Sequence, residues 1–110
     1  MAEPSTDVMQ GTLDLLLLKT LSLEPTHGFG IARRIEQLSH HVFRVNPGSL
    51  LLAFQRLERA GLIDSEWRAT EHNRRAKFYR LTRKGRKQLE HETKDWERRI
   101  AAVGRILEAQ

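Results

Sequence analysis

The sequence predicts a mainly α-helical domain that carries one small β-hairpin. Apolar residues recur with a helical period in three segments before residue 61. Two short segments that alternate between apolar and polar residues follow, at 62–67 and 76–81. Beyond them, apolar residues at heptad spacing run to residue 107 and predict one long helix. A chain of 110 residues has the size of a single domain with one core.

The composition excludes several classes of function. The chain has no cysteine, which rules out a disulfide scaffold, a thiolate zinc site, an iron–sulfur cluster and a cysteine nucleophile. No apolar run approaches the length of a membrane span, and the first eight residues lack a signal-peptide pattern, so we expect a cytoplasmic protein. The five histidines have no metal-ligand spacing and no catalytic motif is present, so we expect no metal, no cofactor and no enzyme activity.

The first helix is predicted at 13–21, after a flexible N-terminus at 1–8. Thr12 is the expected N-cap residue, because its hydroxyl can accept a hydrogen bond from the first turn. Leu15 and Leu18 lie off the apolar stripe that is expected to face the core, so we expect them to contact a second subunit. That core stripe is expected to consist of Leu13, Leu16, Leu17 and Leu21.

Two further helices are predicted before residue 61. Residues 24–28 contain a proline and a glycine and break the chain before the second helix, which ends near residue 39. After a short strand at 43–45, a third helix is expected with Asn46 or Ser49 as its N-cap and Gly61 just beyond its end. The core-facing residues of these helices are expected to be Ile31, Ala32, Ile35, Leu38, Leu50, Ala53, Phe54 and Leu57.

The hairpin joins its two strands through a polar loop at 68–75, with Trp67 expected to pack at its base. Thr82 is then expected to cap the long fourth helix, which extends to about residue 107. Its heptad seam has no later element to cover it, so it predicts a second subunit. The expected dimerisation residues are Leu15, Leu18, Leu89, Trp96, Ile100, Val103 and Leu107.

Three short helices followed by a hairpin are the element order of a winged helix-turn-helix, predicted here at 9–81 with a C-terminal dimerisation helix at 82–110. In this arrangement the third helix enters the major groove of DNA, where Gln55 and Arg56 fit adenine and guanine as bidentate partners. The alternative is that the arginines of this face only pair with Glu58 or Glu36. The expected DNA-binding residues are Ser49, Leu51, Gln55, Arg56, Arg59, Arg74, Arg75 and Lys77.

The positive charge is concentrated in one part of the chain. Lysine and arginine number 19 against 14 acidic residues, a net charge of +5. Residues 62–88 hold nine basic and three acidic side chains, a local net charge of +6. A polyanion partner such as duplex DNA requires a localised field of this kind, although a solvated basic face without a partner has the same composition.

Five segments of the chain resemble the PadR-like transcriptional regulators: GTLDLLLL at 11–18, HGFGI at 27–31, GSL at 48–50, AFQRLE at 53–58 and RRAKFYRLT at 74–82. In order and at this spacing they cover roughly residues 9–107. The resemblance implies a winged-helix homodimer that represses transcription, often of genes for detoxification or efflux, and that a small molecule relieves in some members. The length matches the short subgroup with a single C-terminal helix.

The third helix departs from the pattern of that family. The family usually carries a Tyr-Pro pair after the GSL segment, where the tyrosine hydroxyl reaches DNA, and this chain has Leu51 and Leu52 there. These two side chains can pack on a thymine methyl group but cannot donate a hydrogen bond. Phe29 stands where the family more often has a tyrosine.

Trp96 lies in the middle of the heptad seam. By two-fold symmetry its copy can lie opposite, so that two indoles sandwich a small aromatic effector, an arrangement that resembles some family members. The alternative is a large interface anchor with no ligand.

Two other functions remain open at this point. One is a protein–protein interaction module that uses the apolar surface of Leu51 and Leu52. The other is RNA binding by the basic hairpin, which the aromatic content of only 6% makes the weaker alternative, because single-stranded RNA is held mostly by stacking.

Overall fold

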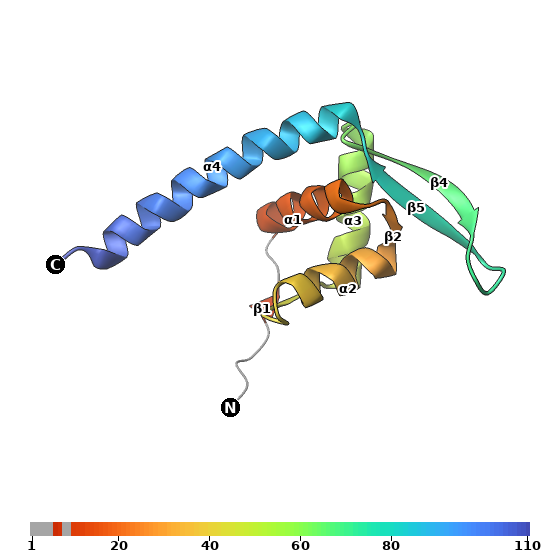
Figure 1. Ribbon diagram of the computed structural model, residues 1–110, viewed down its shortest axis with the longest axis horizontal. Coiled ribbons are helices and arrows are strands. Elements are labelled where there is room, and N and C mark those ends of the chain that lie inside the picture. The colour runs from red at the N-terminus through yellow and green to blue at the C-terminus, as the bar shows by residue number, and fades with distance from the viewer. Residues whose placement is uncertain (1–5, 8–9) are drawn as a thin grey trace.

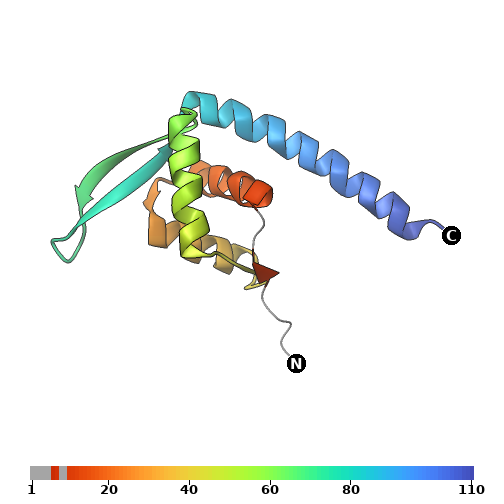
Figure 2. The same ribbon diagram turned by 180° about the vertical axis from the view of Figure 1, so that it is seen from behind.

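The computed structural model describes residues 6–7 and 10–110. Figures 1 and 2 show the first three helices gathered in one cluster, with the β-hairpin projecting on one side and the last helix on the other. The mainly α-helical fold with a small hairpin is confirmed. Its elements are β1 (Thr6–Asp7), α1 (Gln10–Leu23), β2 (Thr26–His27), α2 (Gly28–Leu38), β3 (Phe43–Arg44), α3 (Pro47–Arg59), β4 (Ile63–Ala69), β5 (Arg75–Leu81) and α4 (Arg83–Glu108).

The predicted flexible N-terminus at 1–8 falls mostly outside the described residues. The exception is β1, which pairs in parallel with β3. In these two residues a paired backbone therefore replaces the free end that the sequence predicted.

Helix α1 is the centre of the core, and Leu13, Leu17 and Leu21 are buried as predicted, but Leu18 takes the place that was expected for Leu16. It begins at Gln10, so Thr12 lies inside the helix and is not its cap. Leu18 is fully buried within the protomer, whereas Leu16 is only half-buried. The prediction of Leu18 as a dimer contact is therefore wrong in this structure, because its side chain packs against the protomer's own core. Leu15 is half-buried and does not belong to that core.

The segment from α2 to the end of α3 follows the predicted pattern except at Leu38, which was expected to face the core and is 54% exposed at the end of α2. The side chain of His27 caps α2 by accepting a hydrogen bond from the backbone N–H of Gly30 through Nδ1, at 3.1 Å. Of the two caps considered for α3, Asn46 is the one present, since its side chain accepts from Gly48 and Ser49. Beyond α3, Gly61 adopts a φ of +76°. This is the left-handed conformation that commonly ends a helix and that glycine adopts most easily.

The hairpin strands β4 and β5 pair antiparallel over seven residues each, from Ile63 opposite Leu81 to Ala69 opposite Arg75. The loop is shorter than the predicted 68–75, because both strands continue into this polar stretch. Strand β2 was not predicted, and it pairs antiparallel with β5 to give a three-stranded sheet in the order β2-β5-β4. The sheet rests on α3, where the rings of Phe54 and Tyr79 stack 4.0 Å apart.

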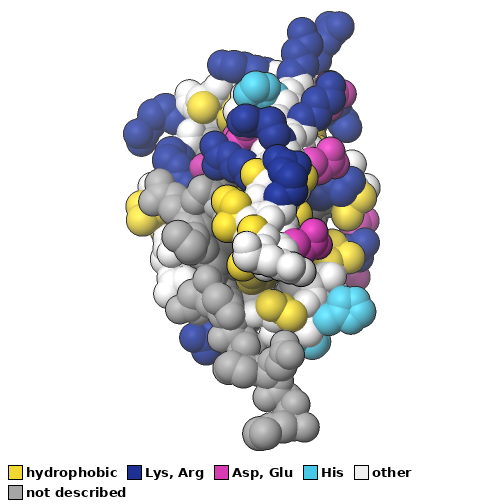
Figure 3. Space-filling model, turned by 90° about the vertical axis from the view of Figure 1, so that its left-hand side faces the viewer, with side chains coloured by type: hydrophobic (Ala, Val, Ile, Leu, Met, Phe, Trp, Pro, Cys, Tyr) yellow, Lys and Arg dark blue, Asp and Glu magenta, His cyan; other side chains and the backbone are white. Residues whose placement is uncertain are grey.

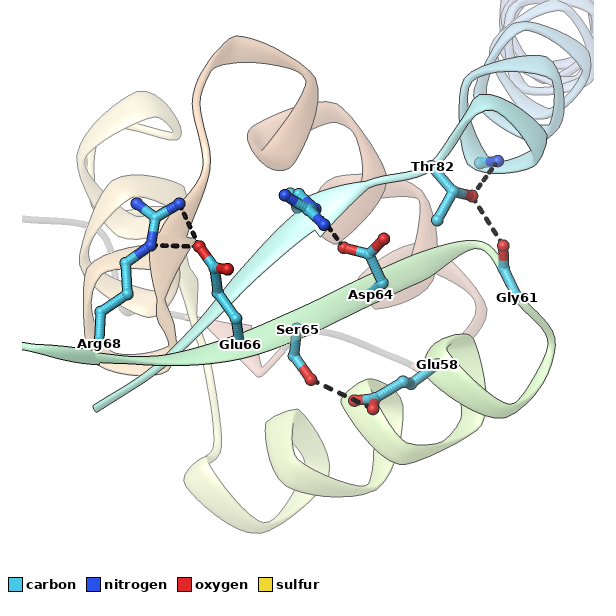
Figure 4. A network of polar contacts seen from close by, with 9 residues as sticks. Glu58, Gly61, Asp64, Ser65, Glu66, Arg68 and Thr82 are labelled. Carbon is cyan, nitrogen blue, oxygen red and sulfur yellow. Dashed lines mark hydrogen bonds and ion pairs between the residues drawn. The ribbon is translucent and has the colours of Figure 1, made fainter. Parts of the chain in front are cut away.

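Helix α4 begins where the hairpin ends. Thr82 is its N-cap as predicted: its hydroxyl accepts from the N–H of Gly85 and donates to the carbonyl of Gly61, as Figure 4 shows. The first half of α4 packs on α1 through Leu89, and the second half projects away from the cluster of helices (Figure 1). Among the described residues, no helix combines the length and the apolar character that crossing a bilayer requires.

Candidate nucleic-acid interface

The outer face of α3 carries most of the side chains that were predicted to read DNA. The apolar side of α3 is held in the core by four buried residues, which fixes the opposite side toward solvent. Leu51 and Leu52 are 55% and 60% exposed. The exposed positions of this face are Ser49, Leu51, Leu52, Gln55 and Arg59.

The hairpin β4–β5, which we call the wing, presents its unpaired cations at its tip. Thr70 and Arg74 close the loop through a backbone hydrogen bond of 2.7 Å, and Asn73 takes a left-handed φ of +59° within it. Arg74 and Arg75 are exposed, and among the described residues neither makes an ion pair with an acidic side chain. Within the described part of the chain, the cations of the tip are therefore free of ion pairs, although Glu71 lies in the same loop.

Nearer the base of the wing, acidic side chains neutralise the cations. Figure 4 shows that Arg68 pairs with Glu66 and that Ser65 donates a hydrogen bond to Glu58. Asp64, also labelled there, forms an ion pair with Arg80. These pairs are exposed and stabilise the fold little. They do, however, reduce the charge that this part of the wing offers to a polyanion.

The structure brings residues of α3 and of the wing together. Gln55 and Arg59 of α3 line one open hollow of about 490 Å³ with Lys77 of β5, and Glu58 completes its wall. The ammonium group of Lys77 lies 3.6 Å from the Glu58 carboxylate. Residues far apart in the sequence, predicted for the same interface, thus share one surface.

Arg56 does not follow the prediction. Its guanidinium group pairs with Asp14 of α1 instead of lying free on the reading face, and it also bypasses the two partners that were considered, Glu58 and Glu36. Burial raises the pKa of Asp14 above its ordinary value, although the hydrogen bond and charge of Arg56 act in the opposite direction. The sequence held no signal for this pair, because the two residues lie on different helices.

The seam of α4 is only partly available to a partner subunit. Leu89 packs against the protomer's own core, which differs from its predicted role as a dimer contact. Beyond it the apolar side chains become steadily more exposed as α4 leaves the cluster of helices. Their exposed fractions are 40% for Trp96, 53% for Ile100, 54% for Val103, 74% for Ile106 and 79% for Leu107.

The first turns of α4 carry four of the nine basic residues that the segment 62–88 contains. No acidic residue lies in the first turn, which is the positive end of the helix dipole and normally favours acidic side chains. Further lysine and arginine residues follow along α4, and Figure 3 shows such side chains gathered over the upper part of the side toward which this helix projects. The cations at this helix start are Arg83, Lys84, Arg86 and Lys87.

Comparison with known proteins identifies the family. The model of the transcriptional regulator PadR-like family matches residues 17–91, which is more than half of the chain. The chain belongs to the PadR-like family. PadR-like proteins are transcriptional regulators, so this protein is a regulator and not an enzyme. In the part of the chain that the structure describes, no three histidine or acidic side chains are grouped as a metal site.

Solved PadR-like structures share the winged-helix fold. A transcriptional regulator from Clostridium thermocellum is 25% identical, with a TM-score of 0.82 over 90% of this chain and 93% of that chain. A PadR family transcriptional regulator from Eggerthella lenta is 31% identical, with a TM-score of 0.77 over 92% of this chain and 86% of that chain. A transcriptional regulator from Mycobacterium tuberculosis is 43% identical over 49% of this chain and 50% of its own length.

Proposed function

We propose that this PadR-like protein is a homodimeric repressor that binds a pseudo-palindromic operator in duplex DNA. The observation that supports the proposal most is the common surface of Gln55 and Arg59 with Lys77, which joins α3 to a wing with exposed cations at its tip. A winged helix reads bases with one helix and holds the backbone with its hairpin, and this surface provides both components.

The two components have different roles. Gln55 on α3 can form a bidentate pair with adenine, and the methyl groups of Leu51 and Leu52 can pack against thymine. Arg74 and Arg75 at the tip of the wing neutralise phosphates, which contributes affinity without sequence preference. Arg56 is left out of the base contacts, since Asp14 holds its guanidinium group.

Dimerisation through α4 would set the two reading helices at the correct spacing. The exposed side chains of Trp96, Ile100 and Val103 form a continuous apolar stripe on a helix that projects from the protomer. When two protomers pair about a two-fold axis at this stripe, the stripe is buried between them. The two copies of α3 are then presented to successive turns of DNA, about 34–36 Å apart. Leu15, half-buried on α1, extends the same interface.

Trp96 is also the proposed site of a small aromatic effector that relieves repression. It is 40% exposed in the protomer, which leaves part of the indole for a symmetric partner or for a ligand between the two copies.

Removing the wing-tip cations tests the proposal. In the double variant Arg74→Ala and Arg75→Ala, we expect weaker binding to every duplex, because two phosphate contacts per protomer are lost. The logarithm of the association constant falls linearly with the logarithm of the salt concentration, and this slope should become shallower by about 2 for each wing bound. The reason is that each neutralised phosphate releases roughly one counterion on binding. Gel shifts with an intergenic fragment that contains an inverted repeat, over a series of salt concentrations, measure this slope; an unchanged slope contradicts the role of the wing.

Gln55→Ala is the matched variant on α3. It should weaken binding to the operator by roughly 1–3 kcal/mol and leave binding to scrambled duplex unchanged, because it removes a base contact and no charge. Equal losses on both duplexes would argue that Gln55 does not read bases.

The exposure of Leu51 and Leu52 supports a second candidate function, a protein–protein interaction module. Under this alternative the purified protein gives no salt-sensitive gel shift with any duplex, and a single partner protein protects this surface. A gel shift that responds to salt and to operator sequence excludes it.

A further inference from the structure

An apolar groove lies between the start of α2, the outer side of α3 and the wing. It is open to solvent and encloses about 390 Å³, a volume within the range of small-molecule sites. The residues that matter for its chemistry are His27, Phe29, Leu51, Trp67, Arg75 and Tyr79. The functions proposed so far use some of its lining residues but assign no ligand to the groove itself.

Flat aromatic surfaces form several of its walls. Phe29 is 83% exposed and Trp67 is 59% exposed, although the sequence predicted that Trp67 would pack at the base of the wing. Tyr79 is held in place by its parallel stack with Phe54. Aromatic rings with free faces bind other rings by stacking or by edge-to-face contact.

The charged side chains that line the groove, Arg75 and Lys77, are both basic, although Lys77 also pairs with Glu58 outside the lining. The guanidinium group of Arg75 lies 5.6 Å from the ring centre of Trp67, and the ammonium group of Lys77 lies 5.7 Å from that of Tyr79. Both residues line the groove, and among the described residues that line it none is acidic. An anionic group bound among these aromatic walls would therefore meet cations and no carboxylate of the lining.

We propose that this groove binds a small, flat aromatic molecule that carries a negative charge, and that its presence interferes with DNA binding. The second part rests on the proposed function, because Leu51, Arg75 and Lys77 belong both to the groove and to the proposed DNA interface. The groove is separate from the effector position proposed at Trp96, since α4 and the wing project on opposite sides of the molecule (Figure 1).

Tryptophan fluorescence tests the site directly. The chain has two tryptophans, so the Trp96→Phe variant reports on Trp67 alone. Titration with 2-naphthoate should quench this emission to saturation, with a dissociation constant below about 1 mM. The uncharged analogue 2-naphthamide should bind about fivefold more weakly, because it lacks the attraction to the cations.

Two neighbouring leucines provide matched variants. Leu51 lines the groove and Leu52 does not, although both are on α3 and similarly exposed. Leu51→Ser should weaken 2-naphthoate binding about five- to tenfold, whereas Leu52→Ser should change it less than about twofold. Because both side chains are more than half exposed, neither substitution threatens the fold.

Several outcomes would overturn the site. The first is a Trp67 emission that 2-naphthoate does not quench to saturation, and the second is an equal change of 2-naphthoate affinity in the two leucine variants. The third is an unchanged titration curve in a Trp67→Phe variant, which would place the ligand near Trp96. Interference with DNA is measured separately in a gel shift with the unsubstituted protein, because Trp96 belongs to the proposed dimer seam, and 2-naphthoate should release the bound DNA. If 2-naphthoate quenches Trp67 to saturation but the affinity for DNA does not change, only the interference with DNA binding is contradicted. If the unsubstituted protein binds no DNA at all, the proposed function is contradicted, and the fluorescence titration still tests the ligand site.

Discussion

Replacing Ile100 and Val103 together by glutamate is expected to convert the proposed dimer to a monomer and to abolish the proposed tight binding to an operator. Each side chain is about half exposed in the protomer, so the substitutions leave the protomer core intact. In the proposed dimer they would bury four carboxylates along one seam, where like charges and lost apolar contacts both oppose association. Sedimentation velocity at micromolar protein measures the change.

The loss of DNA affinity should be large, because the two copies of α3 and of the wing would no longer be linked in one dimer. Linked binding raises affinity about 10²–10⁴-fold over a single head, and the monomer loses this factor. Ala101→Glu is the control, since this exposed residue of α4 faces away from the stripe of Trp96, Ile100 and Val103. If the double variant still sediments as a dimer, or if Ala101→Glu dissociates it equally, the seam is not the interface.

Gly85→Ala is expected to destabilise the protein by about 3 kcal/mol or more. Gly85 is buried in the first turn of α4, and a Cβ atom there would lie 2.0 Å from the carbonyl oxygen of Leu62 and 2.7 Å from a methyl group of Leu81. The Leu62 carbonyl cannot move away freely, because it accepts a hydrogen bond from the N–H of Thr82. Urea denaturation measures the lost free energy of unfolding.

Gly104→Ala is the matched control within the same helix. A Cβ atom at Gly104 meets nothing within 4 Å in the protomer, so the higher helix propensity of alanine should stabilise α4 by up to about 1 kcal/mol. The two substitutions are chemically identical and should have opposite signs. Equal stability of both variants would show that α4 does not approach the base of the wing as closely as described.

The sequence predicted the features that depend on local chemistry. The capping residues Asn46 and Thr82 and the glycine at 61 occupy the expected positions, because each satisfies a need of the adjacent helix end. On α1 the core residues Leu13, Leu17 and Leu21 were predicted correctly, but Leu16 was chosen in place of Leu18, since residues 15–18 are all leucine and several apolar stripes are possible. Only the packing of the other elements decides among them.

Tertiary contacts account for the rest of what the sequence did not reveal. Strand β2 has two residues, which are too few for an alternating pattern, and it is defined by its pairing with β5. The groove between α2, α3 and the wing could not be foreseen either, because its walls come from separate segments. The solvent-exposed side of α3 was predicted correctly except for Arg56, whose partner Asp14 lies 42 residues earlier.

The cationic first turns of α4 have a consequence for the free protein. Four basic residues within five positions repel one another and the positive end of the helix dipole, and no acidic residue of that turn offsets them. Added sodium chloride screens this repulsion, so the melting temperature of the free protein should rise over the same range of concentration in which its DNA complex dissociates. Higher ionic strength thus favours free protein, which is more stable to heat, over the complex with DNA.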